Sequence, residues 1–208
     1  MIVLRKEFFY FGGSMLPEEL LQKVISGDRQ AFGQLYEQFK SKVYNTCLAY
    51  LQQENDAEEA TQDIFVEVFH AAETFRGTAS VSTWIYRIAI NKCLDRLRYK
   101  NRQKRFAFIS SLFNIETGAL MYDSPVFDHP GVKLENKEKA AVLFKAIKEL
   151  TENQQTAFIL KHVEGLTQKE IAAIMNIGEK AVESQLSRAK DNLRKILSDF
   201  YDNDRRGK

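Results

Sequence analysis

Cysteine, histidine and proline are all scarce in this chain. Its 208 residues include two cysteines, three histidines and three prolines. Cys47 and Cys93 lie far apart without a CxxC motif, and the scattered histidines have no metal-ligand spacing, which argues against a zinc site. We therefore expect two buried free thiols, as in a reducing cytoplasm, and no bound metal.

Long apolar runs are also missing. No stretch approaches the ~20 apolar residues of a membrane-spanning helix, so we expect no membrane insertion. The first residues, MIVLRKEFFYFGGSM, are interrupted by Arg5, Lys6 and Glu7 and do not form a signal peptide. We expect residues 1–14 to be a disordered extension or to follow an upstream start codon, with the folded protein beginning near Met15.

Alternating strand patterns do not recur, whereas apolar residues three and four apart do. The sequence predicts an all-α protein of two small helical domains joined by a flexible linker, because periodicity fails near Pro125 and Pro130. The expected parts are residues 15–105, a linker over 106–133, residues 134–200 and a tail over 201–208. Helices are expected over 17–27, 31–51, 56–74, 83–105 and 134–149, from Thr151 to Gly165, and after Thr167.

The net charge of +2 conceals an uneven distribution. Residues 52–75 contain seven acids and no lysine or arginine, whereas residues 76–105 contain nine basic residues and one acid, Asp95. This asymmetry favours two different partners on adjacent surfaces.

The acidic segment predicts an amphipathic helix. An apolar stripe runs along one side, and Glu59, Asp63 and Glu67 lie four apart on the other. These carboxylates could chelate a divalent metal, but no histidine or further carboxylate at a useful spacing supports them. A protein interface or a solvated face is favoured instead.

The basic segment combines cations with aromatic residues. Cations follow a phosphate backbone and aromatic rings stack on unpaired bases, so the combination favours nucleic acid. The loop over residues 75–82 could hold an extruded base. For Trp84, a core position and a base-stacking role both stay open.

The C-terminal part contains two predicted capping boxes, Thr151 with Gln154 and Thr167 with Glu170. The stretch TQKEIAAIMNIGEKAVESQLSRAK then predicts a helix-turn-helix whose second helix reads a DNA groove. Its outward face carries Lys180, Ser184, Gln185 and Arg188. There Arg188 suits phosphate or guanine and Gln185 suits adenine. The alternative is a plain helical hairpin with a solvated face.

Two long stretches resemble bacterial sigma factors of the extracytoplasmic-function (ECF) group. DAEEATQDIFVEVFHAAETFRGTASVSTWIYRIAINKCLDRLR resembles their second region, and LTENQQTAFILKHVEGLTQKEIAAIMNIGEKAVESQLSRAKDNLRKIL resembles their fourth. The resemblance covers residues 16–197 and implies a cytoplasmic promoter-specificity subunit of RNA polymerase that is not an enzyme and needs no cofactor. It also implies an anti-sigma factor that clamps the two domains closed.

The resemblance further implies site residues. Contacts to core RNA polymerase would come from Asp56, Glu59, Gln62, Asp63 and Glu67. Contacts to the single-stranded −10 element would come from Phe75, Arg76, Thr78, Ser80, Trp84, Arg87, Asn91 and Arg96. Contacts to the duplex −35 element would come from Lys180, Ser184, Gln185 and Arg188. The alternatives are a free-standing helix-turn-helix regulator and a DNA-processing enzyme, for which no catalytic constellation is present.

Overall fold

The computed structural model describes residues 15–113 and 137–206, and every regular element in these ranges is helical, which confirms the all-α prediction. The elements are α1 (Pro17–Ile25), α2 (Arg29–Leu51), α3 (Glu54–Ala71), the 3₁₀ turn η1 (Ala72–Thr74), α4 (Val81–Phe113), α5 (Lys137–Lys148), α6 (Glu152–His162), α7 (Gln168–Met175) and α8 (Glu179–Arg206). Residues 1–14 and most of the expected linker lie outside the described ranges.

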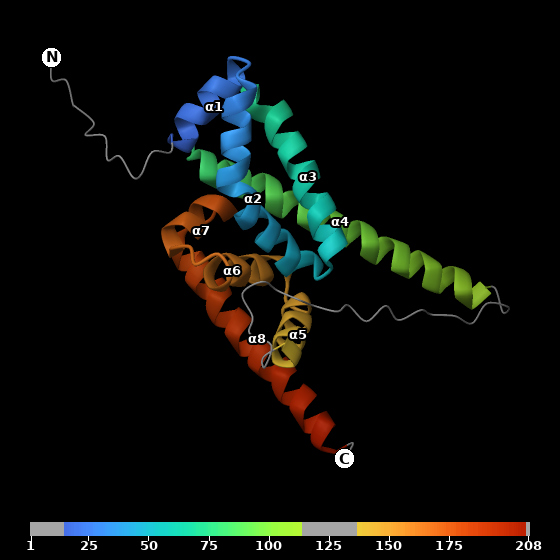
Figure 1. Ribbon diagram of the computed structural model, residues 1–208. Coiled ribbons are helices and arrows are strands. Elements are labelled where there is room, and N and C mark those ends of the chain that lie inside the picture. Colours follow the sequence, from blue (N-terminus) through green and yellow to red (C-terminus); the bar gives the residue numbers. More distant parts are fainter. Residues whose placement is uncertain (1–14, 114–136, 207–208) are drawn as a thin grey trace.

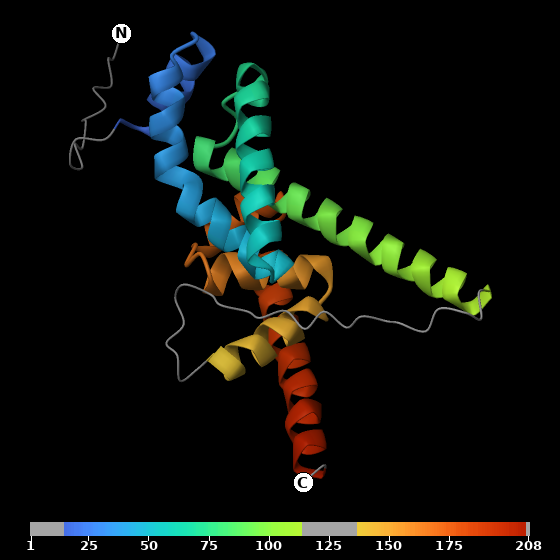
Figure 2. The same ribbon diagram turned by 45° about the vertical axis from the view of Figure 1, so that its right-hand side comes forward.

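The helices form two packed groups that touch each other. Helices α1 to α4 make the upper group in Figure 1, and α5 to α8 make the lower one. The lower end of α2 lies against α6, and α4 contacts α7. The C-terminal ends of α4 and α8 project away from this body, as both ribbon views show (Figures 1 and 2).

The core of the upper group follows the expected apolar stripe of α3. Ala57, Ala60 and Ile64 are fully buried there, and α3 packs on α2 and α4. Cys47 on α2 and Cys93 on α4 are free and buried, as expected, with their sulfur atoms 3.7 Å apart.

Two helices are longer than the amphipathic pattern of their sequence predicted. Helix α4 continues past Arg105 to Phe113, and α8 continues through most of the expected tail to Arg206. Neither extension contains proline, which would break a helix, or glycine, which would weaken it. The first eight residues of the expected linker, 106–113, therefore belong to α4.

The expected capping box at Thr151 is wrong. Thr151 begins α6 without a side-chain hydrogen bond to its backbone. The side chain of Gln154 is buried and instead accepts a hydrogen bond from Asn192 of α8, at 3.0 Å. The tertiary contact with α8 therefore uses the side chain that the capping box would need.

The capping box at Thr167 is confirmed. The backbone N–H of Glu170 donates to the Thr167 hydroxyl at 3.3 Å, and the backbone N–H of Thr167 donates to the Glu170 carboxylate at 2.8 Å. This reciprocal pair fixes the first turn of α7, where the helix-turn-helix begins.

The two threonines give a matched test of this cap. Thr167→Ala should lower the free energy of unfolding by about 1 kcal/mol, which corresponds to a melting temperature lower by about 2–4 °C. Thr151→Ala should leave the melting temperature nearly unchanged, because its hydroxyl makes no capping bond. Equal melting of the two variants in a circular-dichroism scan would contradict a stabilising role for the Thr167 cap.

Candidate nucleic-acid interface

The helix-turn-helix is built on a small buried core. Ile171 and Ile174 of α7 pack with Val182 and Leu186 of α8, and all four are buried. Between the helices the chain turns at Asn176, which has a left-handed φ of 55°. Asparagine tolerates this conformation better than most residues, so the turn is tight without a glycine at that position.

The outer face of α8 presents the predicted DNA-reading residues. Lys180 and Arg188 are exposed, whereas Ser184 and Gln185 are half-buried. Neither cation forms a hydrogen bond or ion pair with another described residue. Both charges are therefore available to a ligand such as a DNA phosphate.

In the loop before α4, some residues stabilise the fold and others are exposed to solvent. Ser80 accepts a hydrogen bond from the backbone N–H of Thr83 at 3.1 Å, so it serves as the N-cap of α4. Trp84 is half-buried and packs on Phe75, with ring centroids 5.2 Å apart. Arg76 and Thr78 are exposed at the same loop. Trp84 thus occupies a core-edge position from which one part of the ring stays accessible.

Further along α4, the predicted DNA-binding cations do not point freely into solvent. Arg87 donates hydrogen bonds to the carbonyl oxygens of Ile174, at 3.2 Å, and Ala173, at the C-terminal end of α7. Asn91 remains exposed. Arg96 turns to α3 and pairs with Asp63 at 2.7 Å, one turn from Glu59. Of these three side chains, the structure leaves only Asn91 open to a ligand.

Four of the five predicted polymerase-binding residues take part in ion pairs with α4. Arg96 contacts Glu59 at 3.3 Å as well as Asp63. Two further pairs join Glu67 to Lys92, at 3.5 Å, and Asp56 to Lys100. The fifth residue, Gln62, lies in a groove between α2 and α3 that is also lined by Tyr36 and Tyr44.

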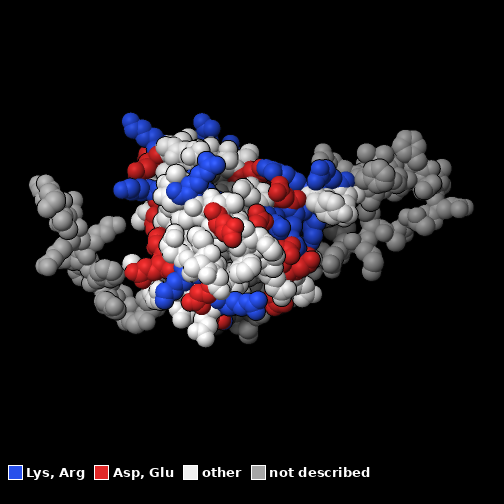
Figure 3. Space-filling view, turned by 90° about the horizontal axis from the view of Figure 1, so that it is seen from above, with Lys and Arg blue, Asp and Glu red and all other residues white. Residues whose placement is uncertain are grey.

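The electrostatics of Arg96 follow from these contacts. Partial burial disfavours its charged form, but the hydrogen bonds to Asp63 and Glu59 outweigh this, so its pKa lies above the ordinary value. Figure 3 shows basic and acidic side chains next to each other on the side from which α4 projects. The acidic and basic segments are therefore one interlocked surface rather than two separate patches.

Several contacts join the two groups of helices, and sequence patterns did not identify them. The Tyr50 hydroxyl donates to the Thr156 hydroxyl at 2.6 Å in a buried position. Arg98 binds the Glu152 carboxylate through two nitrogens, at 2.9 and 2.6 Å. That hydrogen bonding lowers the pKa of the Glu152 carboxyl. No local motif could reveal these pairs, because their partners lie far apart in the chain.

A half-buried carboxylate, that of Glu164, also lies between the groups. The Tyr86 hydroxyl donates to Glu164 at 2.8 Å. Burial raises the pKa of the Glu164 carboxyl and outweighs the opposing effect of this hydrogen bond. Burial, together with the Glu164 charge, also raises the pKa of the Tyr86 hydroxyl above its ordinary value. The hydrogen bond between Tyr86 and Glu164 is thus a further polar contact between the two groups of helices.

Within the described ranges, no three histidine, cysteine, aspartate or glutamate side chains gather closely enough to hold a metal ion. In the same ranges, no helix is both long and apolar enough to span a bilayer.

Two family matches coincide with these two groups of helices. Residues 35–103 match Sigma-70 region 2, and residues 140–193 match Sigma-70, region 4. The ECF RNA polymerase sigma factor SigW of Bacillus subtilis is 29% identical over 188 residues, which are 89% of this chain and 99% of that protein. The ECF RNA polymerase sigma-E factor of Escherichia coli K12 is 28% identical over 174 residues, 83% of this chain and 89% of that protein.

Two solved structures share the fold. CnrH in complex with the cytosolic domain of CnrY aligns with a TM-score of 0.62 and 22% identity, covering 88% of this chain and 97% of that chain. RpoE of Bartonella quintana, in complex with the anti-sigma factor NepR, aligns with a TM-score of 0.59 and 18% identity, covering 80% and 96%.

Proposed function

The chain belongs to the sigma factors of the ECF group, and we propose that it binds core RNA polymerase in the cytoplasm and directs transcription from particular promoters. One observation carries this proposal. A single chain contains both sigma-70 regions in order, and the relatives it matches are covered over nearly their whole length.

The geometry supports a division of roles between the helices. Helix α8 would read the duplex −35 element, because its Lys180 and Arg188 are exposed and without an ion-pair partner among the described residues. The loop with Arg76 and Thr78 would bind the single-stranded −10 element, next to the accessible part of the Trp84 ring. The carboxylates of α3 would meet a basic surface of the polymerase.

An anti-sigma factor is proposed as a further partner. Both structural relatives named above were solved with a bound protein, and one of these is called an anti-sigma factor. In this chain the two helix groups are already in contact through Tyr50 and Arg98. A partner that binds both groups together would hold this closed arrangement.

Binding to core polymerase tests the proposed function. The wild-type protein should co-migrate with bacterial core RNA polymerase on a size-exclusion column, and Asp63→Arg/Glu67→Arg should lose this co-migration. Reversing two charges at one interface is expected to weaken binding by at least tenfold, because like charges then meet.

The matched control is Lys92→Ala/Arg96→Ala. It breaks the same intramolecular ion pairs but keeps the α3 carboxylates, so it should still co-migrate. If the wild-type protein fails to bind core polymerase, the sigma-factor proposal is wrong and a free-standing regulator becomes the better hypothesis.

A further inference from the structure

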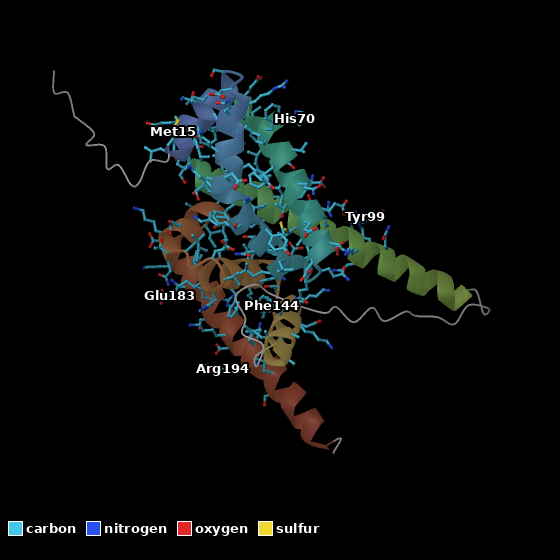
Figure 4. All side chains as sticks on the ribbon, in the orientation of Figure 1. Met15, His70, Tyr99, Phe144, Glu183 and Arg194 are labelled. Carbon is cyan, nitrogen blue, oxygen red and sulfur yellow. The ribbon has the colours of Figure 1, made fainter. Side chains whose placement is uncertain are left out.

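The ion pairs between α3 and α4 form a continuous ladder. Its α4 cations are Lys92, Arg96 and Lys100, and its α3 carboxylates are Glu67, Asp63, Glu59 and Asp56. The residue numbers of the carboxylates decrease along α3 as those of their paired cations increase along α4, so the two helices run antiparallel here. In Figure 4, His70 labels the upper end of α3, and Tyr99 labels α4 beside the lower part of α3.

The remaining cations of this part of α4 are occupied as well. Arg87 binds carbonyl oxygens of α7, and Arg98 binds Glu152 of α6. Every lysine and arginine of α4 from residue 87 to residue 100 therefore has a partner within the chain. In the basic segment that sequence alone assigned to nucleic acid, four of the nine cations are held in ion pairs in the free protein.

The ladder contacts made by Glu59, Asp63 and Glu67 are of a kind that exchanges easily. The side chains of Glu67, Asp63 and Glu59 are 50%, 45% and 69% exposed, whereas Asp56 at the end of the ladder is only 22% exposed. Exposed ion pairs contribute little net stability, so a competing charge can replace either partner without unfolding the helices. DNA phosphate and a basic protein surface are such competitors, one for each side of the ladder.

We infer that the α3 carboxylates act as an internal substitute for DNA phosphate, so that the α4 face with Lys92, Arg96 and Lys100 is a reserve binding surface for the backbone of single-stranded DNA. A partner that offers cations to α3 frees this surface. Because such coupling is reciprocal, DNA bound at α4 equally strengthens binding of that partner at α3. Only the identity of the basic partner, core polymerase, rests on the proposed function.

Neutralising the ladder should increase DNA binding by the free protein. The variant Glu59→Gln/Asp63→Asn/Glu67→Gln removes the partners of Lys92 and Arg96 and leaves all α4 cations in place. Its affinity for a single-stranded oligonucleotide, measured by fluorescence anisotropy, should rise by about tenfold. Two additional cations on phosphates should also steepen the plot of log affinity against log salt by about 1.4.

A second triple variant separates this effect from overall charge. Glu54→Gln/Glu58→Gln/Glu73→Gln changes the net charge equally, but none of these three carboxylates forms an ion pair with a described residue. This control should change the affinity by less than about threefold and should leave the salt slope unchanged. Equal affinities and equal slopes for the two triple variants would overturn the inference.

The experiment allows for a misfolded ladder variant and for failure of the proposed function. If the ladder variant lost its helical circular-dichroism signal, Glu67→Gln alone would replace it, with an expected change in slope of about 0.7 from the release of Lys92. The DNA measurement contains no polymerase, so its failure is distinguishable from failure of the co-migration experiment. A gain in DNA affinity without polymerase binding would retain the inference and reject the proposed function.

Discussion

The variant Lys180→Ala/Arg188→Ala is expected to lose on the order of 100-fold in affinity for duplex promoter DNA that carries the −35 element. Both side chains project from the outer face of α8, and neither is held by another described residue. Because two cations leave the phosphates, the salt dependence should become shallower by about 1.8 in logarithmic slope. The measurement is binding of the polymerase holoenzyme to promoter fragments at several salt concentrations.

A control variant on the same helix tests whether position matters. Arg194→Ala/Lys195→Ala removes the same charge further along α8, beyond the helix-turn-helix core; Figure 4 labels Arg194 there, and Glu183 near the start of the helix. Arg194 already pairs with Asp191 at 3.3 Å. The control should lose less than about threefold in affinity. Equal losses in the two variants would mean that α8 attracts DNA by net charge alone.

Tyr50→Ala is expected to lower the free energy of unfolding by about 3–5 kcal/mol, as for other large buried aromatic residues. Its side chain is fully buried at the end of α2 and reaches Thr156 of α6. The substitution therefore empties space in the seam between the two helix groups and removes a buried hydrogen bond. Urea unfolding followed by circular dichroism measures the loss.

Two further tyrosine variants distinguish the ring from the hydroxyl. Tyr50→Phe keeps the ring but deprives the Thr156 hydroxyl of its donor, so it should cost about 1–3 kcal/mol. Tyr99→Ala removes a tyrosine that is 56% exposed on α4 and should change stability by at most about 0.5 kcal/mol. A Tyr50→Ala protein as stable as Tyr99→Ala would show that the contact between the helix groups contributes nothing to folding.

Local features of the fold were predictable because they depend on residues three or four apart. The Thr167 capping box and the buried stripe of α3 both formed as the spacing predicted. The Thr151 box failed although its spacing was equally good, because Gln154 lies under α8 and bonds to Asn192. A local motif is reliable only where its side chains do not form tertiary contacts instead.

The buried end of α2 shows a second reason why sequence patterns miss core residues. From Thr46 to Leu51 every residue is buried, so this turn has no solvated side and no amphipathic pattern. The reason is that α6 covers the side which α3 and α4 leave open (Figure 2). Sequence periodicity assigns one buried face to a helix, and it therefore missed Tyr50.

The sequence by itself determined the helical class, the helix-turn-helix and the uneven distribution of charge, since each of these depends on residues that are close together in the chain. Only the tertiary structure decided what the charges contact. Glu152 and Arg98 lie 54 residues apart, and Asp63 and Arg96 lie 33 apart. Their pairing depends on how whole helices cross, which no local pattern records. For this reason two segments that sequence alone assigned to different partners proved to be partners of each other.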